Sequence, residues 1–288
     1  MQSKLTSKHL TVTINHFGAE VCSVKSNNNV EFVWQGDKVV WARHAPVLFP
    51  IVGKLKDNFF IYEGKKYELP QHGFARDMDF DLLEKNETSL TFQLVSNNET
   101  KNKFPFDFVF QIKYILEDKI LHSHYTITNP LNKTLFASVG AHPGFNCPIL
   151  PGEKFEDYYL EFESDVFSLT QLNNGLRSDA KAPLRLNDKK LFLTKELFDN
   201  DALVFENSQI NKVSLYSSRS NHKITMQCIN WPYFGIWAKK GNTQFICLEP
   251  WYGIASHENG SPELPKKDGI IHIAAGKDFK AKFSLIFS

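Results

Sequence analysis

Short bursts of alternating apolar and polar residues recur along the chain, and they predict β-strands. Side chains of a strand point alternately to its two faces, so a single buried face gives a period of two. The alternation runs through residues 10–14, 30–34 and 90–94. It also fills two longer stretches, residues 106–116 and 120–128, whose close spacing predicts a hairpin with long arms. Further strands are predicted at residues 158–162, 212–216, 223–228, 233–238, 244–248 and 279–287.

Helical signals are few. The best is at Thr194, which is placed to cap a short turn that contains Lys195 and Glu196 and ends near Asn200. No regular alternation of strand and helix indicates a parallel sheet, and no repeat or low-complexity linker divides the chain. The pattern therefore predicts an all-β protein, a large antiparallel β-sandwich formed as one domain over residues 1–288.

The composition of the chain limits the kinds of molecule that we expect it to bind. The 288 residues are 42% hydrophobic and 14% aromatic, which is enough to bury a large core. A net charge of +1 provides no field to hold nucleic acid or an anionic membrane, so we expect a small neutral or singly charged ligand. Residues 1–20 contain no apolar run of signal-peptide length, so we expect a soluble cytoplasmic protein. The four cysteines form no C-x-x-C pair and are expected to be small buried hydrophobes: Cys22, Cys147, Cys228 and Cys247.

The familiar motifs of nucleotide binding, of serine hydrolases and of zinc proteases are absent. Three segments instead place ionisable side chains beside glycine or proline, at residues 71–76, 140–145 and 247–251. His142 and Glu249 each precede a proline, which restricts both to extended backbone and predicts that each lies where a strand ends. Such positions favour a pocket at the rim of a sandwich.

Glu249 follows the apolar run of residues 245–248, which is typical of a strand covered on both faces. Burial there would raise its pKa toward the range of a general base, although a rim glutamate bonded to main-chain N–H groups has the same pattern. His142 is suited to proton transfer near neutral pH, although most single histidines are core residues bonded to a carbonyl. His72 and Arg76 are four residues apart and are expected to face one space, with a surface arginine beside an unrelated histidine as the alternative.

A metal-dependent enzyme is an alternative that the residue types alone do not exclude. His72, His142 and Glu249 are two histidines and a carboxylate, a known ligand set for a metal-dependent hydrolase or isomerase. His122 and His124 share a strand face, but no third ligand accompanies them, so a solvated face is the favoured interpretation.

Five motifs together give a more specific reading. They are RHAPVLFP at residues 43–50, HGFAR at 72–76, GAHPGF at 140–145, NDALVF at 200–205 and LEPW at 248–251. In this order they resemble the aldose 1-epimerases, or galactose mutarotases, and in particular the bacterial branch near the hexose-6-phosphate mutarotases and the lactose-operon accessory protein. The resemblance implies a galactose-mutarotase-like β supersandwich with no obligatory metal or organic cofactor.

The resemblance also implies roles for individual residues. His142 would be the general acid that protonates the ring oxygen of a sugar, and Glu249 the base that takes the proton of the anomeric hydroxyl. Substrate-positioning roles are implied for four more residues: His72, Arg76, Asp201 and Arg43. Ring opening, rotation of the aldehyde and closure on the other face then interconvert the α and β anomers of a hexose or hexose phosphate.

This mechanism leads us to expect the imidazole and the carboxyl group on opposite sides of a sugar-sized hollow. A non-catalytic carbohydrate-binding or regulatory protein of the same fold is the alternative, although a binder has no need of a matched proton donor and acceptor. The sequence leaves open which sugar is preferred and whether Arg76 grips a phosphate or a hydroxyl.

Overall fold

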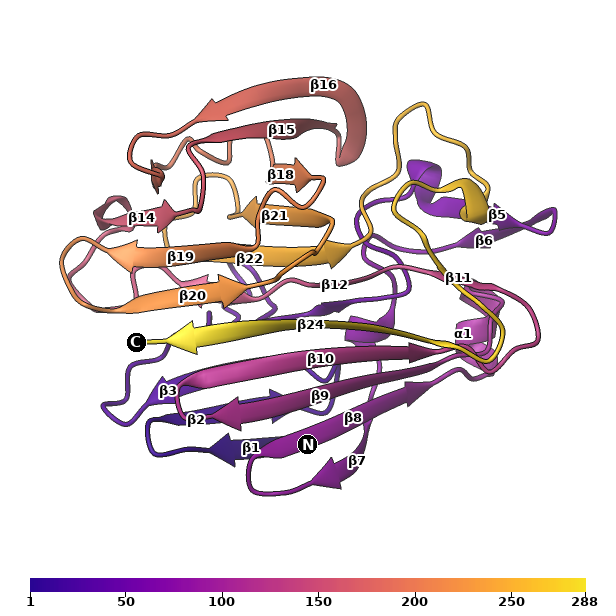
Figure 1. Cartoon of the computed structure of the whole chain (residues 1–288), viewed down its shortest axis with the longest axis horizontal. Helices are drawn as coiled ribbons and strands as arrows, with labels where there is room; N and C mark the ends of the chain where they lie inside the picture. Colours follow the sequence, from indigo (N-terminus) through magenta and orange to yellow (C-terminus); the bar gives the residue numbers. More distant parts are fainter.

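The alternating segments form antiparallel strands in the computed structural model, which describes residues 1–288 (Figure 1). The largest sheet has nine strands in the order Lys190–Phe192 (β17), Tyr158–Glu161 (β14), Lys212–Ser217 (β19), Lys223–Gln227 (β20), Asp278–Phe287 (β24), Ile120–Thr128 (β10), Val109–Glu117 (β9), Ser89–Val95 (β8) and Asp81–Lys85 (β7). A second sheet has the order Leu176–Arg185 (β16), Val166–Asn173 (β15), Leu203–Glu206 (β18), Tyr233–Trp237 (β21), Phe245–Tyr252 (β22), Val139–Ala141 (β12) and Val47–Leu48 (β4), and Gly144–Asn146 (β13) also pairs with β22. Three small sheets contain Gln2–Thr6 (β1), Leu10–Asn15 (β2) and Val21–Ser26 (β3); Phe59–Tyr62 (β5) and Lys65–Glu68 (β6); and Leu135–Ala137 (β11) and Ile271–Ile273 (β23). The predicted all-β, antiparallel class is confirmed.

The long hairpin is confirmed as β9 and β10, in which Ile120 pairs with Glu117. Along β10 buried and half-buried side chains alternate, because one face covers the core and the other faces outward. His122 and His124 lie on the outward face, as expected, and His122 bonds to Ser284 of the neighbouring β24.

Helical structure is limited to one short α-helix, Asn98–Lys103 (α1), and four 3₁₀ turns. The 3₁₀ turns are Lys56–Asn58 (η1), Ala75–Asp77 (η2), Phe155–Asp157 (η3) and Leu264–Lys266 (η4). The predicted turn forms at residues 195–200, but the carbonyl of Thr194, and not its side chain, accepts the N–H of Leu197. The helix α1 was not predicted, because its residues are nearly all polar and show no apolar period; its signal is the cap formed by Asn97 and Thr100. None of these helices has the length or apolarity needed to span a bilayer.

The prediction of a strand at residues 30–34 is wrong. Only isolated bridges form there, between Glu31 and Lys25 and between Val33 and Phe145. The segment is buried, since Phe32, Val33 and Trp34 are all covered. It has no continuous neighbour with which to form a ladder.

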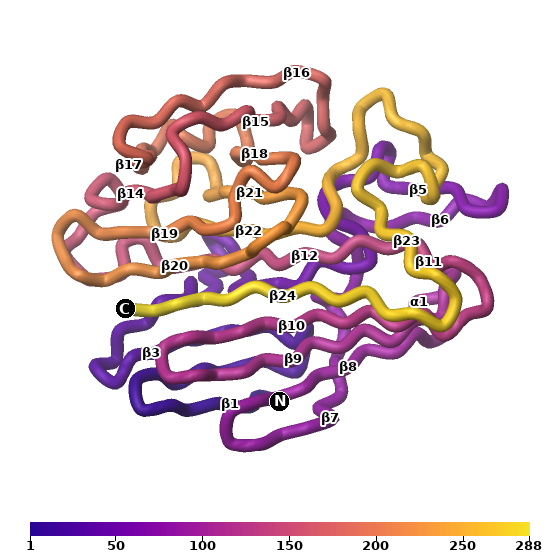
Figure 2. The backbone as a smooth tube through the Cα atoms, in the orientation of Figure 1, coloured from indigo at the N-terminus to yellow at the C-terminus, as the bar shows by residue number.

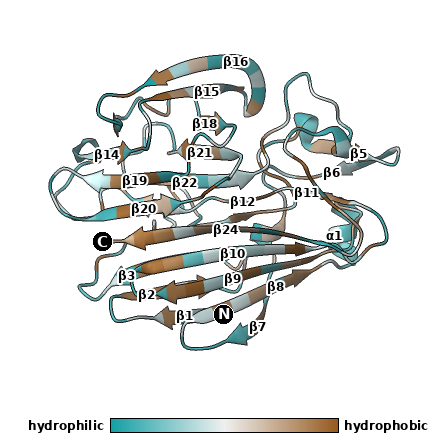
Figure 3. Cartoon of the chain, viewed as in Figure 1, coloured by the Kyte–Doolittle hydropathy of each residue, from teal (hydrophilic) through white to brown (hydrophobic).

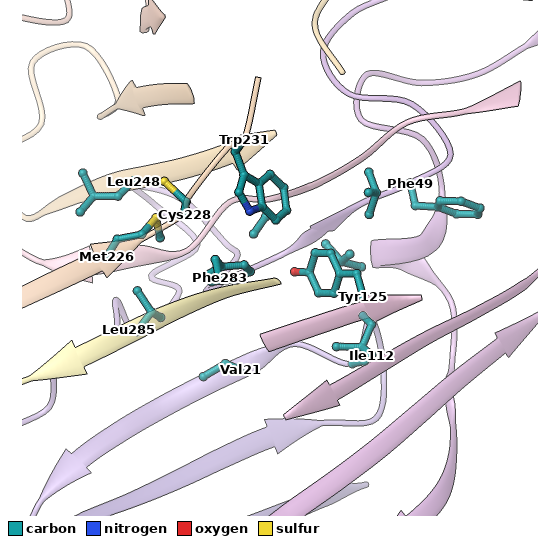
Figure 4. Packing of buried hydrophobic residues seen from close by; sticks show 14 of the residues in the cluster. Val21, Phe49, Ile112, Tyr125, Met226, Cys228, Trp231, Leu248, Phe283 and Leu285 are labelled. Carbon is teal, nitrogen blue, oxygen red and sulfur yellow. The ribbon is translucent and has the colours of Figure 1, made fainter. Parts of the chain in front are cut away.

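A continuous core of 65 buried residues joins the two large sheets and the sheet of β1–β3. The strands are mostly apolar and the connecting loops mostly hydrophilic (Figure 3). Figure 4 shows one part of this core, in which the rings of Tyr125, Trp231 and Phe283 meet with centroid distances of 5.9 to 6.4 Å. The cysteines are all free and buried, as predicted, and Cys228 is among the residues of Figure 4.

Strand β22 positions the site. It lies between β21 on one side and β13 and β12 on the other, and these two short strands pair with different parts of it. The hairpin of β15 and β16 forms the free edge of the same sheet, at the top of Figure 2. A pocket lies between this hairpin and the point where the neighbour of β22 changes from β13 to β12.

Candidate active site

Glu249 lies inside β22, and its side chain is only 1% exposed. The preceding run of residues 245–248 is fully buried, as predicted for a strand covered on both faces. The prediction that Glu249 ends its strand is wrong, because β22 continues through Pro250 to Tyr252. Pro250 is tolerated because it lies between the part of β22 that pairs with β13 and the part that pairs with β12, where the ladder is already interrupted.

His142 occupies the connection between β12 and β13, so the strand-end prediction holds for this residue. Its main-chain N–H donates to the carbonyl of Pro46 at 3.1 Å. The imidazole stacks on the ring of Trp41, with centroids 5.1 Å apart and an interplanar angle of 30°, and meets Trp237 edge-on at 5.7 Å. The aromatic rings fix the orientation of the imidazole and leave it 8% exposed.

The two side chains are in direct contact, since Nε2 of His142 lies 3.2 Å from Oε2 of Glu249. We had expected them on opposite sides of a hollow, and the structure corrects this geometry. The hollow lies beside the pair, in a pocket of about 470 Å³ that both residues line. The pair therefore presents one shared edge to whatever occupies the pocket.

Burial changes the charge state of both groups. It raises the pKa of Glu249 well above the ordinary 4.5, and the negative charge of Asp201 acts in the same direction, while the indole of Trp251 opposes the shift without reaching hydrogen-bond geometry. Burial, together with the positive charges of Arg76 and Arg43, lowers the pKa of His142 from 6.5 to about 3. Both shifts favour the uncharged forms, a protonated carboxyl group and a neutral imidazole.

His72 lies in a turn and Arg76 lies in the 3₁₀ turn η2 that follows it. His72 and Gly73 both have positive φ, of 68° and 72°, and a Cβ at Gly73 would lie 2.3 Å from the carbonyl oxygen of Phe49. Only glycine fits there. Nδ1 of His72 accepts the main-chain N–H of Gly53 at 3.1 Å, so the ring faces the pocket with its Nε2–H. Burial lowers the pKa of His72 well below its ordinary value, and so do the neighbouring His142 and arginines.

Two guanidinium groups share one counter-ion at the pocket wall. Arg43 contacts Asp77 at 2.9 Å, and Nε of Arg76 lies 3.8 Å from the same carboxylate. Nη2 of Arg76 also donates to the carbonyl of Gln71 at 2.7 Å. Burial, together with the charge of Arg43, lowers the pKa of Arg76 to about 10. The pair of arginines therefore carries a positive charge that Asp77 only partly neutralises.

Asp201 completes the set from the turn before β18, where its φ is 83° and its Oδ1 accepts the N–H of Ala202. All six residues singled out from the sequence line the same pocket: Arg43, His72, Arg76, His142, Asp201 and Glu249. The segments that contain these residues are distant in sequence, and the order of the strands between them brings them together.

The structure changes which side chains are placed to bind a metal ion. The side-chain atoms that lie within 4.8 Å of one another belong to His142, Cys247 and Glu249, all buried. His72 is not in this group. The two-histidine set inferred from residue types is therefore not the one that the fold assembles.

Comparison with known proteins assigns the family. Residues 1–260 match the family model for aldose 1-epimerase. The chain belongs to the aldose 1-epimerase family. It is 33% identical to the plasmid-encoded protein LacX of Lactococcus lactis subsp. lactis over 266 residues, 89% of each chain. The structure is similar to that of a galactose mutarotase related enzyme from Lactobacillus acidophilus, with a TM-score of 0.95, 36% identity and coverage of 100% and 97% of the two chains. It is also similar to a galactose mutarotase-like protein from Lactobacillus casei, with a TM-score of 0.91, 32% identity and full coverage of both chains.

In this aldose 1-epimerase family member, several further residues line the pocket that were not predicted from the sequence. Trp41 and Trp237 enclose the imidazole, Gln71 borders the arginines, and Leu172 and Gly175 come from the β15–β16 hairpin. For Trp41 a signal existed in the adjoining RHAPVLFP motif. The hairpin residues have no local signal, because only the fold of the sheet brings the hairpin over the pocket.

Trp251, two residues after Glu249 on β22, also lines the pocket. Its ring lies between two glycines on the neighbouring strands: a Cβ at Gly140 would lie 2.7 Å from the ring, and one at Gly235 would lie 2.3 Å from it. The indole N–H is buried and has no hydrogen-bond partner in the protein. Such an orphaned donor beside Glu249 is suited to a polar ligand group.

Proposed function

We propose that this protein is a mutarotase that interconverts the α and β anomers of a hexose or hexose phosphate by acid/base ring opening. The observation that carries the proposal is the buried pair of His142 and Glu249, whose side chains lie 3.2 Å apart and border a pocket of about 470 Å³. This volume is within the range of small-molecule sites. Two proton transfers are the whole of the chemistry, so no step requires an organic cofactor or a metal.

The contact between the two groups suits the reaction better than the separation we first expected. The ring oxygen that must gain a proton and the hydroxyl oxygen that must lose one are both bonded to C1. An acid and a base that touch each other can therefore reach both oxygens at once. A sugar seated beside the pair would place C1 against their shared edge.

The pair needs one mobile proton. In the roles implied by the family resemblance, His142 delivers it to the ring oxygen and Glu249 accepts the proton of the anomeric hydroxyl. Because burial leaves the proton on the carboxyl group in the empty pocket, we propose that it crosses the 3.2 Å contact to Nε2 when sugar hydroxyl groups bind. Ring closure on the opposite face returns both protons and resets the pair.

The other polar residues are proposed to orient the sugar. His72 would donate from Nε2, Asp201 would accept from hydroxyl groups, and the rings of Trp41 and Trp237 would pack against apolar sugar faces. Asp77 is the only carboxylate that forms an ion pair with Arg43 and Arg76, and Asp201 also lines the pocket. Two neighbouring guanidinium groups favour a hexose phosphate, with a neutral hexose as the alternative.

A non-catalytic sugar-binding protein is the second candidate, and one observation favours it. An imidazole whose pKa is about 3 is uncharged at neutral pH and is a weak source of protons unless the neighbouring carboxyl group supplies one. Such a protein would bind sugars in the same pocket without accelerating anomer exchange.

Anomer exchange measured by NMR or polarimetry separates the two candidates. We expect the wild-type protein to accelerate exchange of glucose, galactose or their 6-phosphates above the buffer rate. Glu249→Gln and His142→Asn should each lose about 10²- to 10⁴-fold of this rate. Matched controls are Glu84→Gln and His124→Asn, which change the same residue types on the outer face of the nine-stranded sheet. Sugar binding without exchange would identify a binder, and full activity in Glu249→Gln would refute the assigned base.

A further inference from the structure

The acid/base pair is part of a larger group of side chains. Cys247 and Glu249 are two residues apart on β22, so their side chains point to the same face of the strand. His142 approaches this face from the β12–β13 connection. We call His142, Cys247 and Glu249 the three-ligand cluster; their N, S and O atoms all lie within 4.8 Å of one another.

We propose that the three-ligand cluster is a binding site for a borderline divalent transition-metal ion of the Zn²⁺ type, which occludes the pocket and inhibits the protein. The inhibitory part of this proposal rests on the proposed mutarotase function. The binding part does not.

The spacing suits a tetrahedral ion. Metal–ligand distances of about 2.0–2.3 Å place neighbouring ligand atoms roughly 3.3–3.8 Å apart around a tetrahedral ion. His142 and Glu249 are already 3.2 Å apart, and the sulfur of Cys247 lies within 4.8 Å of both. Side-chain shifts of about 1–1.5 Å would complete three ligand positions.

The ligand atoms are also free of strong competing bonds. His142 and Glu249 contact each other, and Nδ1 of His142 has no partner. The thiols of Cys22 and Cys228 donate to main-chain carbonyls, whereas the Cys247 thiol makes no such bond. Ion binding would therefore break only the contact between His142 and Glu249.

The charges of the ligands suit a dication at this buried position. Cys247 and Glu249 bind a metal ion as thiolate and carboxylate, and His142 binds it as a neutral imidazole. Two negative ligands offset the charge of +2, so the occupied cluster carries no net charge.

The donor set determines the class of ion. One sulfur, one nitrogen and one carboxyl oxygen suit zinc and its neighbours in the first transition row. Magnesium and calcium require six or more oxygen ligands and should not bind. The remaining coordination position faces the pocket, because His142 and Glu249 line it and Cys247 lies behind them. A bound ion would occupy the place proposed for the anomeric oxygens.

Cobalt titration of the intact protein tests the binding. We expect about one equivalent of Co²⁺ to give the near-ultraviolet charge-transfer band of a cobalt–thiolate bond. Cys247→Ala and Cys247→Ser should abolish the band and weaken Zn²⁺ binding by more than about 100-fold, since loss of a ligand should exceed the effect of losing an outer partner. Cys228→Ala, a buried cysteine elsewhere in the core (Figure 4), is the matched control and should keep both.

Surface histidines need their own control. His122 and His124 have ring centroids 6.4 Å apart and could hold an ion without any thiolate. The double substitution of His122 and His124 by alanine should leave cobalt binding unchanged. Binding that is lost in this variant, or that persists without the thiolate band in Cys247→Ala, would overturn the proposal, and so would no binding at all.

The inhibition is tested in the anomer-exchange assay. With each rate expressed relative to the same variant without metal, Zn²⁺ should inhibit the wild type and Cys228→Ala, Mg²⁺ should inhibit neither, and Cys247→Ala should be more than about 100-fold less sensitive to Zn²⁺. Equal sensitivity of Cys247→Ala and the wild type would refute occlusion at the three-ligand cluster. A protein that binds cobalt through Cys247 but shows no exchange would refute the proposed function and leave the metal site standing.

Discussion

Glu249→Gln tests the charge state of the buried pair through stability as well as activity. The substitution keeps the shape of the side chain and replaces a group that burial holds in its neutral, protonated form by a neutral amide. The folded protein should tolerate it. The unfolded chain distinguishes the two proteins, because an exposed glutamate titrates at its ordinary pKa of 4.5 and a glutamine does not titrate.

The sign follows from the protons bound in each state. The pKa of Glu249 is raised by folding, so above pH 4.5 the folded wild type keeps a proton that the unfolded chain has released. Wild-type stability is therefore lost as the pH rises from 4.5 through the folded-state pKa. Each pH unit in this window costs about 1.4 kcal/mol per proton. Glu249→Gln has no such cost, so it should become steadily more stable than the wild type as pH rises.

The titration of His142 modifies the wild-type curve without changing this difference. Its pKa is lowered from 6.5 to about 3 by folding, so its contribution to stability rises with pH between these values. Between pH 4.5 and 6.5 the two residues have opposite slopes and cancel in the wild type. In Glu249→Gln only the histidine slope remains.

Urea unfolding at several pH values from about 5 to about 8 measures the difference. We expect the free energy of unfolding of Glu249→Gln minus that of the wild type to increase by about 1.4 kcal/mol per pH unit, and to level off once the pH exceeds the raised pKa of Glu249 in the folded protein. Glu84→Gln, on the exposed edge strand β7, controls for the loss of a carboxyl group in general. A difference that stays constant with pH would mean that Glu249 is ionised in the folded protein, and the one-proton account of the pair would fail.

Three further substitutions test the surroundings of the pocket. Gly235→Ala should destabilise the fold by about 1–3 kcal/mol, because the new carbon would lie 2.3 Å from the Trp251 ring, and an unchanged urea midpoint would contradict this packing. Arg76→Lys should raise KM for a hexose 6-phosphate more than for the free hexose, because lysine cannot keep the Gln71 carbonyl bond and also grip a phosphate bidentately; equal changes would argue against a phosphate contact. Lys267→Met should remove a rise in wild-type stability between pH 7 and 10.5, because burial lowers the pKa of Lys267 from 10.5 to about 7 and the unfolded chain binds the extra proton in that window; identical pH profiles would refute the buried amine.

Much of the fold was predictable from the sequence because its signals are local. The alternation in residues 120–128 predicts one buried and one outward face, and β10 has both. The apolar run before Glu249 predicts a strand buried on both sides, as β22 is. The polar helix α1 and the bridge-forming segment at residues 30–34 were misjudged, because a cap in one case and a missing neighbour in the other outweighed the hydrophobic pattern.

The candidate site divides in the same way. By itself the sequence singled out the six residues that line the pocket, from ionisable positions beside Pro143, Pro250 and the flanking glycines and from the family motifs. Only the tertiary structure decided that His142 and Glu249 touch, that Cys247 stands behind them and that Trp41 stacks on the imidazole. These contacts depend on strand order and register across distant segments, and local preferences do not encode which strands become neighbours.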